Sequence, residues 1–191
     1  MTTIKQRLRQ VLSQRRSHTL ADASRVPSAV LLPIYRKQDE YHLLFTKRTE
    51  QVKEHKGEIS FPGGACQEED RTLVDTALRE CFEEIGLMAD DVEILGKLDD
   101  TVTRTSNYLV SPFVAFIPFP YHFKMNPEET EEIIEIPIPA LLDKECRQQE
   151  IEIIRGQEST QYHYYYQGRV IHGATARILN QFLEIFASVS G

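Results

Sequence analysis

The stretch of sequence that decides the fold is FPGGACQEEDRTLVDTALRECFEEIGL, from Phe61 to Leu87. It opens with a Pro-Gly-Gly turn, which glycine makes easily because it tolerates backbone angles that other residues avoid. A helical pattern follows over residues 72–85, and Gly86 is placed to end that helix as its C-terminal cap. The predicted unit is therefore a tight turn that leads, through a short loop, into an amphipathic helix.

Three carboxylates share one side of this predicted helix. At about 100° per residue, Glu80, Glu83 and Glu84 fall within an arc of roughly 100°. Two interpretations are open: a solvated acidic face, or a site for a hard divalent cation. Oxygen ligands at i and i+4 suit Mg²⁺ or Mn²⁺, which keep some waters and take other ligands from substrate phosphates. We expect a neighbouring apolar stripe to pack on a sheet; it consists of Val74, Ala77, Leu78, Cys81 and Ile85.

The composition is typical of an acidic, globular, single-domain protein. The 191 residues suit one domain with small extensions, and 41% of them are hydrophobic, which is enough for a core. A net charge of −7 argues against non-specific nucleic-acid binding, so an anionic substrate would need bridging cations. Three widely spaced cysteines without a CxxC motif indicate a reducing, cytoplasmic compartment. No apolar run reaches the ~20 residues that a membrane helix needs.

Patterning in the rest of the chain predicts strands and helices that mix irregularly in one α/β (α+β) domain. The first 24 residues are expected to form a helical extension before a domain that spans 25–191. This extension is charged and lacks an apolar signal core; an organellar transit peptide is the alternative to a helix that packs on the domain. We expect strands over 27–37, 41–48, 92–100 and 108–118, a hairpin of 150–156 with 162–171, and a closing amphipathic helix over 173–187.

The opening stretch resembles the signature of the Nudix hydrolases, G-x5-E-x7-R-E-U-x-E-E-x-G-U, in which U is a bulky apolar residue. Gly64 and the run from Arg79 to Leu87 match it, whereas the Gly64–Arg79 spacing is one residue longer and Asp70 replaces the middle glutamate. The resemblance implies a Nudix-type α/β/α sandwich with a mixed β-sheet. It also implies an enzyme that cleaves diphosphates with Mg²⁺ or Mn²⁺ and that binds the metal through Glu80, Glu83 and Glu84, which are also the expected catalytic residues.

A second resemblance covers the segment before this signature. Residues 43–64 are similar to the motif of coenzyme A pyrophosphatases, L-L-T-x-R-[S/A]-x3-R-x3-G-x3-F-P-G-G, with Phe45, Thr49 and Lys53 as the departures. Similarity to this Nudix subfamily extends over about residues 27–187. It implies that coenzyme A or its derivatives are hydrolysed to 3′,5′-ADP and 4′-phosphopantetheine. The matching residues are Leu44, Thr46, Arg48, Gly57 and the run from Phe61 to Gly64.

The same segment carries the positive charges expected to bind substrate. Four cations lie within ten residues of an otherwise acidic chain, and a solvated loop is the alternative role for them. The expected substrate-binding residues are Arg48, Lys53, Lys56, Gly63 and Gly64. In Nudix enzymes a glutamate from a distal loop often joins the metals or activates water. Here we choose Glu132 by position, with Glu129 as the second choice.

The sequence is thus compatible with three functions. The first is coenzyme A diphosphatase activity. The second is a Nudix hydrolase for nucleoside diphosphate sugars or nucleoside triphosphates, and the third is a catalytically silent module that senses a nucleotide. The expected partner is a small-molecule nucleotide diphosphate, with no nucleic acid and no membrane, and a homodimer is left open.

Overall fold

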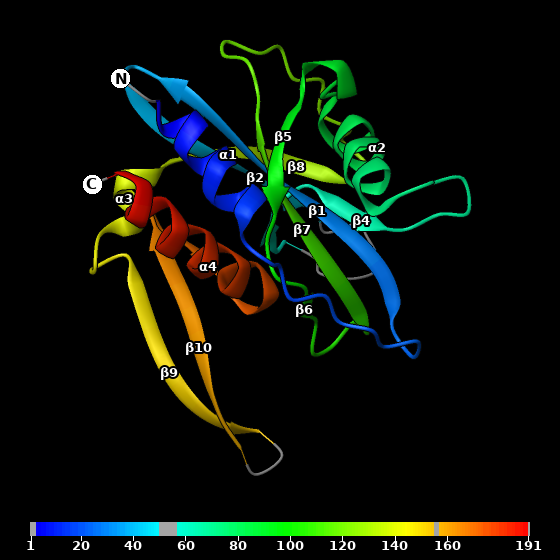
Figure 1. The fold of residues 1–191 in the computed structure, drawn as a ribbon, viewed down its shortest axis with the longest axis vertical. Coiled ribbons are helices and arrows are strands. Elements are labelled where there is room, and N and C mark those ends of the chain that lie inside the picture. Colours follow the sequence, from blue (N-terminus) through cyan, green and yellow to red (C-terminus); the bar gives the residue numbers. More distant parts are fainter. Residues whose placement is uncertain (1–2, 50–56, 155–156, 191) are drawn as a thin grey trace.

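The computed structural model describes residues 3–49, 57–154 and 157–190, which form a main sheet, a smaller sheet and four α-helices (Figure 1). The helices are α1 (Ile4–Gln14), α2 (Leu73–Ile85), α3 (Ile138–Leu142) and α4 (Gly173–Ser190), with a 3₁₀ turn η1 (Ala89–Asp91) after α2. The main sheet holds β1 (Val26–Lys37), β2 (Glu40–Arg48), β3 (Ile59–Ser60), β4 (Gly63–Ala65), β5 (Glu93–Lys97), β6 (Thr101–Val102), β7 (Tyr108–Phe116) and β8 (Thr130–Pro137). The smaller sheet holds β9 (Arg147–Ile154), β10 (Gln157–Tyr166) and β11 (Arg169–Ile171).

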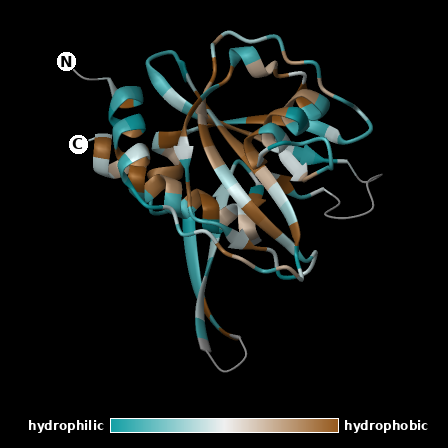
Figure 2. Ribbon diagram, turned by 45° about the vertical axis from the view of Figure 1, so that its right-hand side comes forward, coloured by the Kyte–Doolittle hydropathy of each residue, from teal (hydrophilic) through white to brown (hydrophobic). Residues whose placement is uncertain are grey.

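Strand β1 is the centre of the main sheet, which is mixed. Its central order is β3-β2-β1-β7-β5, and β1 runs parallel to β7 but antiparallel to β2 and β4. Most of β1 is buried on both faces, as expected for an apolar strand covered on two sides. Hydrophobic residues concentrate on these central strands, whereas the β9–β10 hairpin is mainly hydrophilic and extends away from the sheet (Figures 1 and 2).

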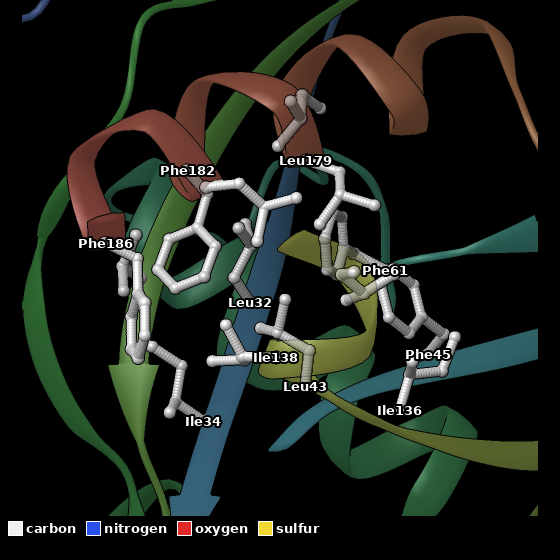
Figure 3. Packing of buried hydrophobic residues seen from close by; sticks show 14 of the residues in the cluster. Leu32, Ile34, Leu43, Phe45, Phe61, Ile136, Ile138, Leu179, Phe182 and Phe186 are labelled. Carbon is white, nitrogen blue, oxygen red and sulfur yellow. The ribbon is translucent and has the colours of Figure 1, made fainter. Parts of the chain in front are cut away.

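Alternate residues of β1 enter two separate cores. Leu31 and Tyr35 belong to the core beneath α2, whereas Leu32 and Ile34 belong to the core that includes residues of α1 and α4. Figure 3 shows Phe182 and the neighbouring apolar residues of α4 directed toward Leu32 and Ile34. The sheet therefore lies between helices on both faces, which confirms the predicted α/β/α sandwich and places the carboxylates of α2 on one face.

Helix α1 is part of the second core. A capping box between Thr3 and Gln6 starts the helix, and Leu8 and Leu12 are buried in the cluster that also contains residues of α4. Gly96 of β5 lies so close to α1 that a β-carbon there would be 2.6 Å from Leu12 Cβ. The structure thus has an amphipathic helix over Ile4–Gln14 that packs on the sheet and α4; the helical extension over 1–24 and the domain boundary at residue 25 stay predictions.

Three expected elements differ in the structure. The strand predicted over 92–100 ends at Lys97, and pairing with β7 resumes in β6 at Thr101; between them the Asp100 N–H donates to the His18 carbonyl oxygen at 2.9 Å instead of to the sheet. The single strand predicted over 162–171 is broken at Gln167 and Gly168, whose φ angles are 47° and 77°. The turn predicted at Pro-Gly-Gly continues into strand β4, which pairs with β1.

None of the helices in the described part of the chain is long and apolar enough to cross a membrane.

Candidate active site

Helix α2 has well-defined ends that fix the positions of its carboxylates. At its start, Thr72 Oγ1 accepts a hydrogen bond from the Asp75 N–H at 3.2 Å, and the Asp75 carboxylate accepts one from the Thr72 N–H at 2.9 Å. At its end, Gly86 adopts a left-handed conformation with φ of 67°. Both ends agree with the sequence-based prediction to within one residue.

Strand β4 passes between β1 and α2, and it does so because Gly63 and Gly64 have no side chains. Gly63 has a φ of 151°, and a β-carbon there would be 2.2 Å from the Ala29 carbonyl oxygen. A β-carbon on Gly64 would be 2.5 Å from Glu80 Oε2. The two glycines are therefore needed for close packing: Gly63 packs against the backbone of β1, and Gly64 packs against the carboxylate of Glu80.

Arg79 organises the acidic side of α2. Its guanidinium donates to both carboxylate oxygens of Asp70, Nε to Oδ1 at 3.0 Å and Nη2 to Oδ2 at 2.9 Å. Nη1 donates to Glu80 Oε1 at 2.8 Å and to Glu83 Oε2 at 2.9 Å. Hydrogen bonding from Arg79 holds the pKa of Asp70 well below its usual range. Asp70, the residue that departs from the Nudix signature, thus anchors the arginine that orients Glu80.

Glu84 is the most deeply buried of the three helix carboxylates, with 2% of its surface exposed. Thr46 Oγ1 and Arg48 Nη1 each donate to it across 3.5 Å. Burial raises the pKa of Glu84 to about 8; Arg48 opposes this rise, whereas the negative charges of Glu80 and Glu129 add to it. The pKa of Glu80 is also raised, chiefly by burial, despite its bond to Arg79.

The structure brings Glu129 to this group and places Glu132 elsewhere. Glu129 lies just before β8, and its charge acts on the pKa values of both Glu80 and Glu84. Glu132 lies within β8, accepts a hydrogen bond from Arg169 Nη2 at 2.6 Å, and lines a separate cavity of about 390 Å³. Of the two distal glutamates considered from the sequence, only the second choice therefore faces the helix carboxylates.

A cavity of about 880 Å³ lies beside these carboxylates, and Arg48, Gly64, Glu80 and Glu129 line one part of it. Arg48 Nε is buried and has no hydrogen-bond partner among residues 3–49, 57–154 and 157–190. The exposed Glu83 is not among the residues that line the cavity. Two further expected substrate-binding residues, Lys53 and Lys56, lie outside the described residues.

The opposite part of the cavity wall was missed from the sequence. It is formed by the loop over 103–106 and the start of α4, and it contributes Arg104 and Arg177. One signal was available: Arg177 lies between the buried residues Ala176 and Ile178 near the positive N-terminal end of a helix, where a cation is unfavourable. That position alone does not reveal which other residues it meets.

The acidic group suits a hard divalent cation. No three His, Cys, Asp or Glu side chains of the described residues form a ready-made metal cluster. However, Glu80, Glu84 and Glu129 are close enough that their like charges raise the pKa values of Glu80 and Glu84, a repulsion that a cation would relieve. Carboxylate oxygens are the donors that Mg²⁺ and Mn²⁺ prefer, and substrate phosphates and water can complete the coordination.

Comparisons with known proteins agree with this geometry. The model of the NUDIX domain matches residues 25–156. A relative from Photorhabdus laumondii, named as an uncharacterized Nudix hydrolase, NudL, is 35% identical over 157 residues, which cover 82% of this chain and 83% of the relative.

Solved structures share the fold at low sequence identity. A MutT/nudix family protein from Enterococcus faecalis superimposes with a TM-score of 0.58 and 13% identity, covering 95% of this chain and 67% of that one. An Ap4A hydrolase from C. elegans superimposes with a TM-score of 0.50 and 15% identity, covering 60% of this chain and 81% of that one. At such identities the likeness concerns the fold alone.

Proposed function

This chain belongs to the Nudix family, and we propose that it hydrolyses the diphosphate linkage of coenzyme A or its derivatives to 3′,5′-ADP and 4′-phosphopantetheine. As a Nudix hydrolase it is an enzyme that acts on phosphorus-containing acid anhydrides, with a pyrophosphate-containing compound as substrate. Nudix hydrolases generally use divalent cations such as Mg²⁺ or Mn²⁺. Coenzyme A as the substrate, a cytoplasmic location and a homodimer are proposals from the sequence.

The observation that carries the coenzyme A proposal is the position in the site of the described residues of the motif over 43–64, which are 43–49 and 57–64. Two residues that match the coenzyme A pyrophosphatase motif, Thr46 and Arg48, donate to the buried carboxylate of Glu84. A third, Phe61, stacks on Phe45 with their ring centroids 4.6 Å apart. Because this segment holds the catalytic carboxylate and lines the cavity, its residues are well placed to determine which diphosphate is bound.

In the proposed mechanism, Glu80, Glu84 and Glu129 would hold the divalent cations, and these would neutralise the phosphate charge. Arg79 keeps the Glu80 carboxylate turned toward the cavity through the 2.8 Å bond. Arg48 places a positive charge beside the cavity, where it can pair with a phosphate oxygen. Water attacks one phosphorus of the diphosphate, the bond from that phosphorus to the bridging oxygen breaks, and the other phosphate leaves with that oxygen. The proton of the attacking water passes to a carboxylate oxygen of Glu129 or Glu80. Glu129 is the better candidate, because within the described residues it forms no ion pair, whereas Glu80 is bonded to Arg79.

The test is product analysis by chromatography and ³¹P NMR with coenzyme A, ADP-ribose and deoxynucleoside triphosphates, each with Mg²⁺ and with Mn²⁺. We expect coenzyme A to have the highest kcat/KM and to yield 3′,5′-ADP. Faster turnover of ADP-ribose or a deoxynucleoside triphosphate would refute the substrate proposal and favour the second function. Binding of a nucleotide without turnover of any substrate would favour the silent sensor, an outcome that the retained Glu80, Glu83 and Glu84 argue against.

The role of Glu84 has its own test. Glu84→Gln keeps the shape of the side chain but removes the negative charge, so kcat should fall by about 100-fold or more if the carboxylate binds metal. A variant with wild-type turnover would remove Glu84 from the mechanism. Asp39→Asn is a matched control, because Asp39 lies in the exposed β1–β2 turn and its side chain pairs only with Arg36 among the described residues.

A further inference from the structure

The far wall of the large cavity carries a guanidinium that forms no ion pair with any described residue. Arg177 of α4 donates from Nη2 to the Val102 carbonyl oxygen at 2.6 Å and from Nε to Thr101 Oγ1 at 3.4 Å. Its Nη1 is buried, and within residues 3–49, 57–154 and 157–190 it has no hydrogen-bond partner and no ion pair with a carboxylate. The two protein acceptors are neutral, so they hold the guanidinium in place without compensating its charge.

A second arginine stands beside it. Arg104, in the loop between β6 and β7, lines the same cavity and reaches the β9–β10 hairpin, where it donates to Glu152 Oε2 at 2.9 Å and to Ser159 Oγ at 3.1 Å. Burial lowers the pKa of Arg177, and the positive charge of Arg104 lowers it further. Glu152 compensates the charge of Arg104 at the exposed end of this wall, whereas the charge of Arg177 has no such partner among the described residues and is unfavourable until an anion binds beside it.

This wall is well separated from the carboxylates. Strands β4, β1, β7 and β6 follow one another across the sheet, with Ala29 paired to Gly64 on one side and to Ser111 on the other. Glu80 lies against Gly64 of β4, and Arg177 donates to Val102 of β6. Three strand spacings of about 4.8 Å separate the backbones of these two strands by roughly 14 Å. That span is longer than one diphosphate group. A ligand that meets both ends therefore needs a second anionic group apart from the diphosphate.

We propose that Arg177, with Arg104 beside it, forms a second anion subsite that binds a phosphate monoester on the nucleotide half of the substrate. The inference rests on the proposed function, because the nucleotide half of coenzyme A carries a 3′-phosphate besides the diphosphate. A guanidinium that is already held by two neutral acceptors is preorganised to donate its remaining N–H groups to phosphate oxygens. The 3′-phosphate is thereby recognised by α4 and the 103–106 loop, whereas the diphosphate is recognised by α2 and the segment over 43–64.

The experiment compares coenzyme A with 3′-dephospho-coenzyme A, which lacks only the monoester. The wild-type enzyme should prefer coenzyme A by about 10- to 100-fold in kcat/KM, the effect of one charge-assisted pair. In Arg177→Met this preference should vanish through a higher KM for coenzyme A, with kcat and the KM for the dephosphorylated substrate little changed. Arg177→Lys should retain part of the preference, because it keeps the charge but loses the planar fork. Arg36→Met is the matched control, since Arg36 is exposed and pairs with Asp39.

Binding without catalysis separates the subsite from the proposed function. Calorimetry should show that 3′,5′-ADP binds at least 10-fold more tightly than AMP and that Arg177→Met removes the difference. If coenzyme A is not hydrolysed but this pattern holds, the proposed function fails and the subsite stands. If coenzyme A and its dephosphorylated form turn over equally well in the wild type, the subsite is refuted while the proposed function stands. A preference that persists in Arg177→Met would also refute it. Should Arg177→Met fold poorly, Arg104→Met provides the second variant, with a weaker loss of preference of about 3-fold expected.

Discussion

Gly64→Ala should reduce activity without reducing stability, because the three atoms nearest to the added methyl group all belong to the carboxylate of Glu80, a proposed metal ligand. The three heavy atoms nearest to a β-carbon at this position are Glu80 Oε2 at 2.5 Å, Cδ at 2.6 Å and Oε1 at 2.7 Å. Gly64 does not have the positive φ that would exclude alanine from the backbone conformation. The side chain that must move is flexible at its end, so the fold can tolerate the substitution.

The size of the displacement follows from these distances. β-Carbons in proteins essentially never approach another heavy atom to less than 3.0 Å, so the carboxylate has to shift by at least about half an ångström. The shift also disturbs the 2.8 Å bond from Arg79 to Glu80. A misplacement of about 1 Å at a reacting centre can cost about 100-fold in rate, so we expect kcat to fall by about 10- to 100-fold. The melting temperature should stay within about 2 °C of the wild type.

The assay is steady-state hydrolysis of the best substrate with saturating Mg²⁺, together with thermal unfolding of the same preparation. A double-mutant cycle with Glu80→Gln tests the cause: once the carboxylate is gone, Gly64→Ala should have little further effect on kcat. Gly63→Ala is the contrasting variant. Its β-carbon would lie 2.2 Å from the Ala29 carbonyl oxygen, on a backbone with φ of 151°, so it should lose stability by several kcal/mol.

Two results would refute this reasoning. Wild-type kcat in Gly64→Ala would mean that the position of the Glu80 carboxylate is unimportant for turnover. Additive losses in the double variant would mean that the methyl group acts on something other than Glu80.

Three further predictions follow from the site. Glu129→Gln should lower kcat by about 100-fold, whereas Glu132→Gln should leave it within about 2-fold, and the reverse order in steady-state assays would restore Glu132 as the distal glutamate. Asp70→Asn should lower the free energy of unfolding by about 2–3 kcal/mol in urea titrations and should also lower kcat, because Arg79 loses its charged anchor; an unchanged midpoint would contradict the anchoring role. In EDTA, the folded state holds the Glu84 proton up to a pKa of about 8, so the stabilisation present at pH 4 should be lost as pH rises through 8. Thermal unfolding should show a smaller fall over that range in Glu84→Gln, and an equal fall in both proteins would assign the pH dependence to another group.

The parts of the site that depend on local sequence could be predicted. Thr72 caps the start of α2 through a hydrogen bond to a residue three positions later, and Gly86 ends the helix because it adopts a left-handed conformation. Both effects are local, so helix geometry alone predicts that Glu80 and Glu84 lie on the same side of the helix. The same reasoning does not show that Glu84 is buried, because its burial depends on Thr46, which lies on a strand nearly forty residues earlier.

The remaining parts depend on contacts between distant segments. Whether Glu129 or Glu132 faces the helix depends on how β8 pairs with β2, where the register shifts between Lys47 and Arg48. Periodicity does not reveal such an irregularity. Arg104 and Arg177 are separated by more than seventy residues and meet only because β6 and α4 pack together. The hydrophobic and charge patterns of the sequence do not indicate that β6 packs against α4.

The burial of α1 and α4 in one core has a consequence for how the protein can be divided. Similarity to the NUDIX domain covers residues 25–156, yet Leu8 and Leu12 of α1 belong to the same core as Phe182 of α4. Figure 3 shows Phe182 packed over this face of the sheet. A fragment cut at the limits of the similarity would expose the apolar face of β1 and β2 to water. We therefore expect α1 and α4 to unfold together with the sheet that they cover, and a recombinant fragment limited to 25–156 to aggregate through this face.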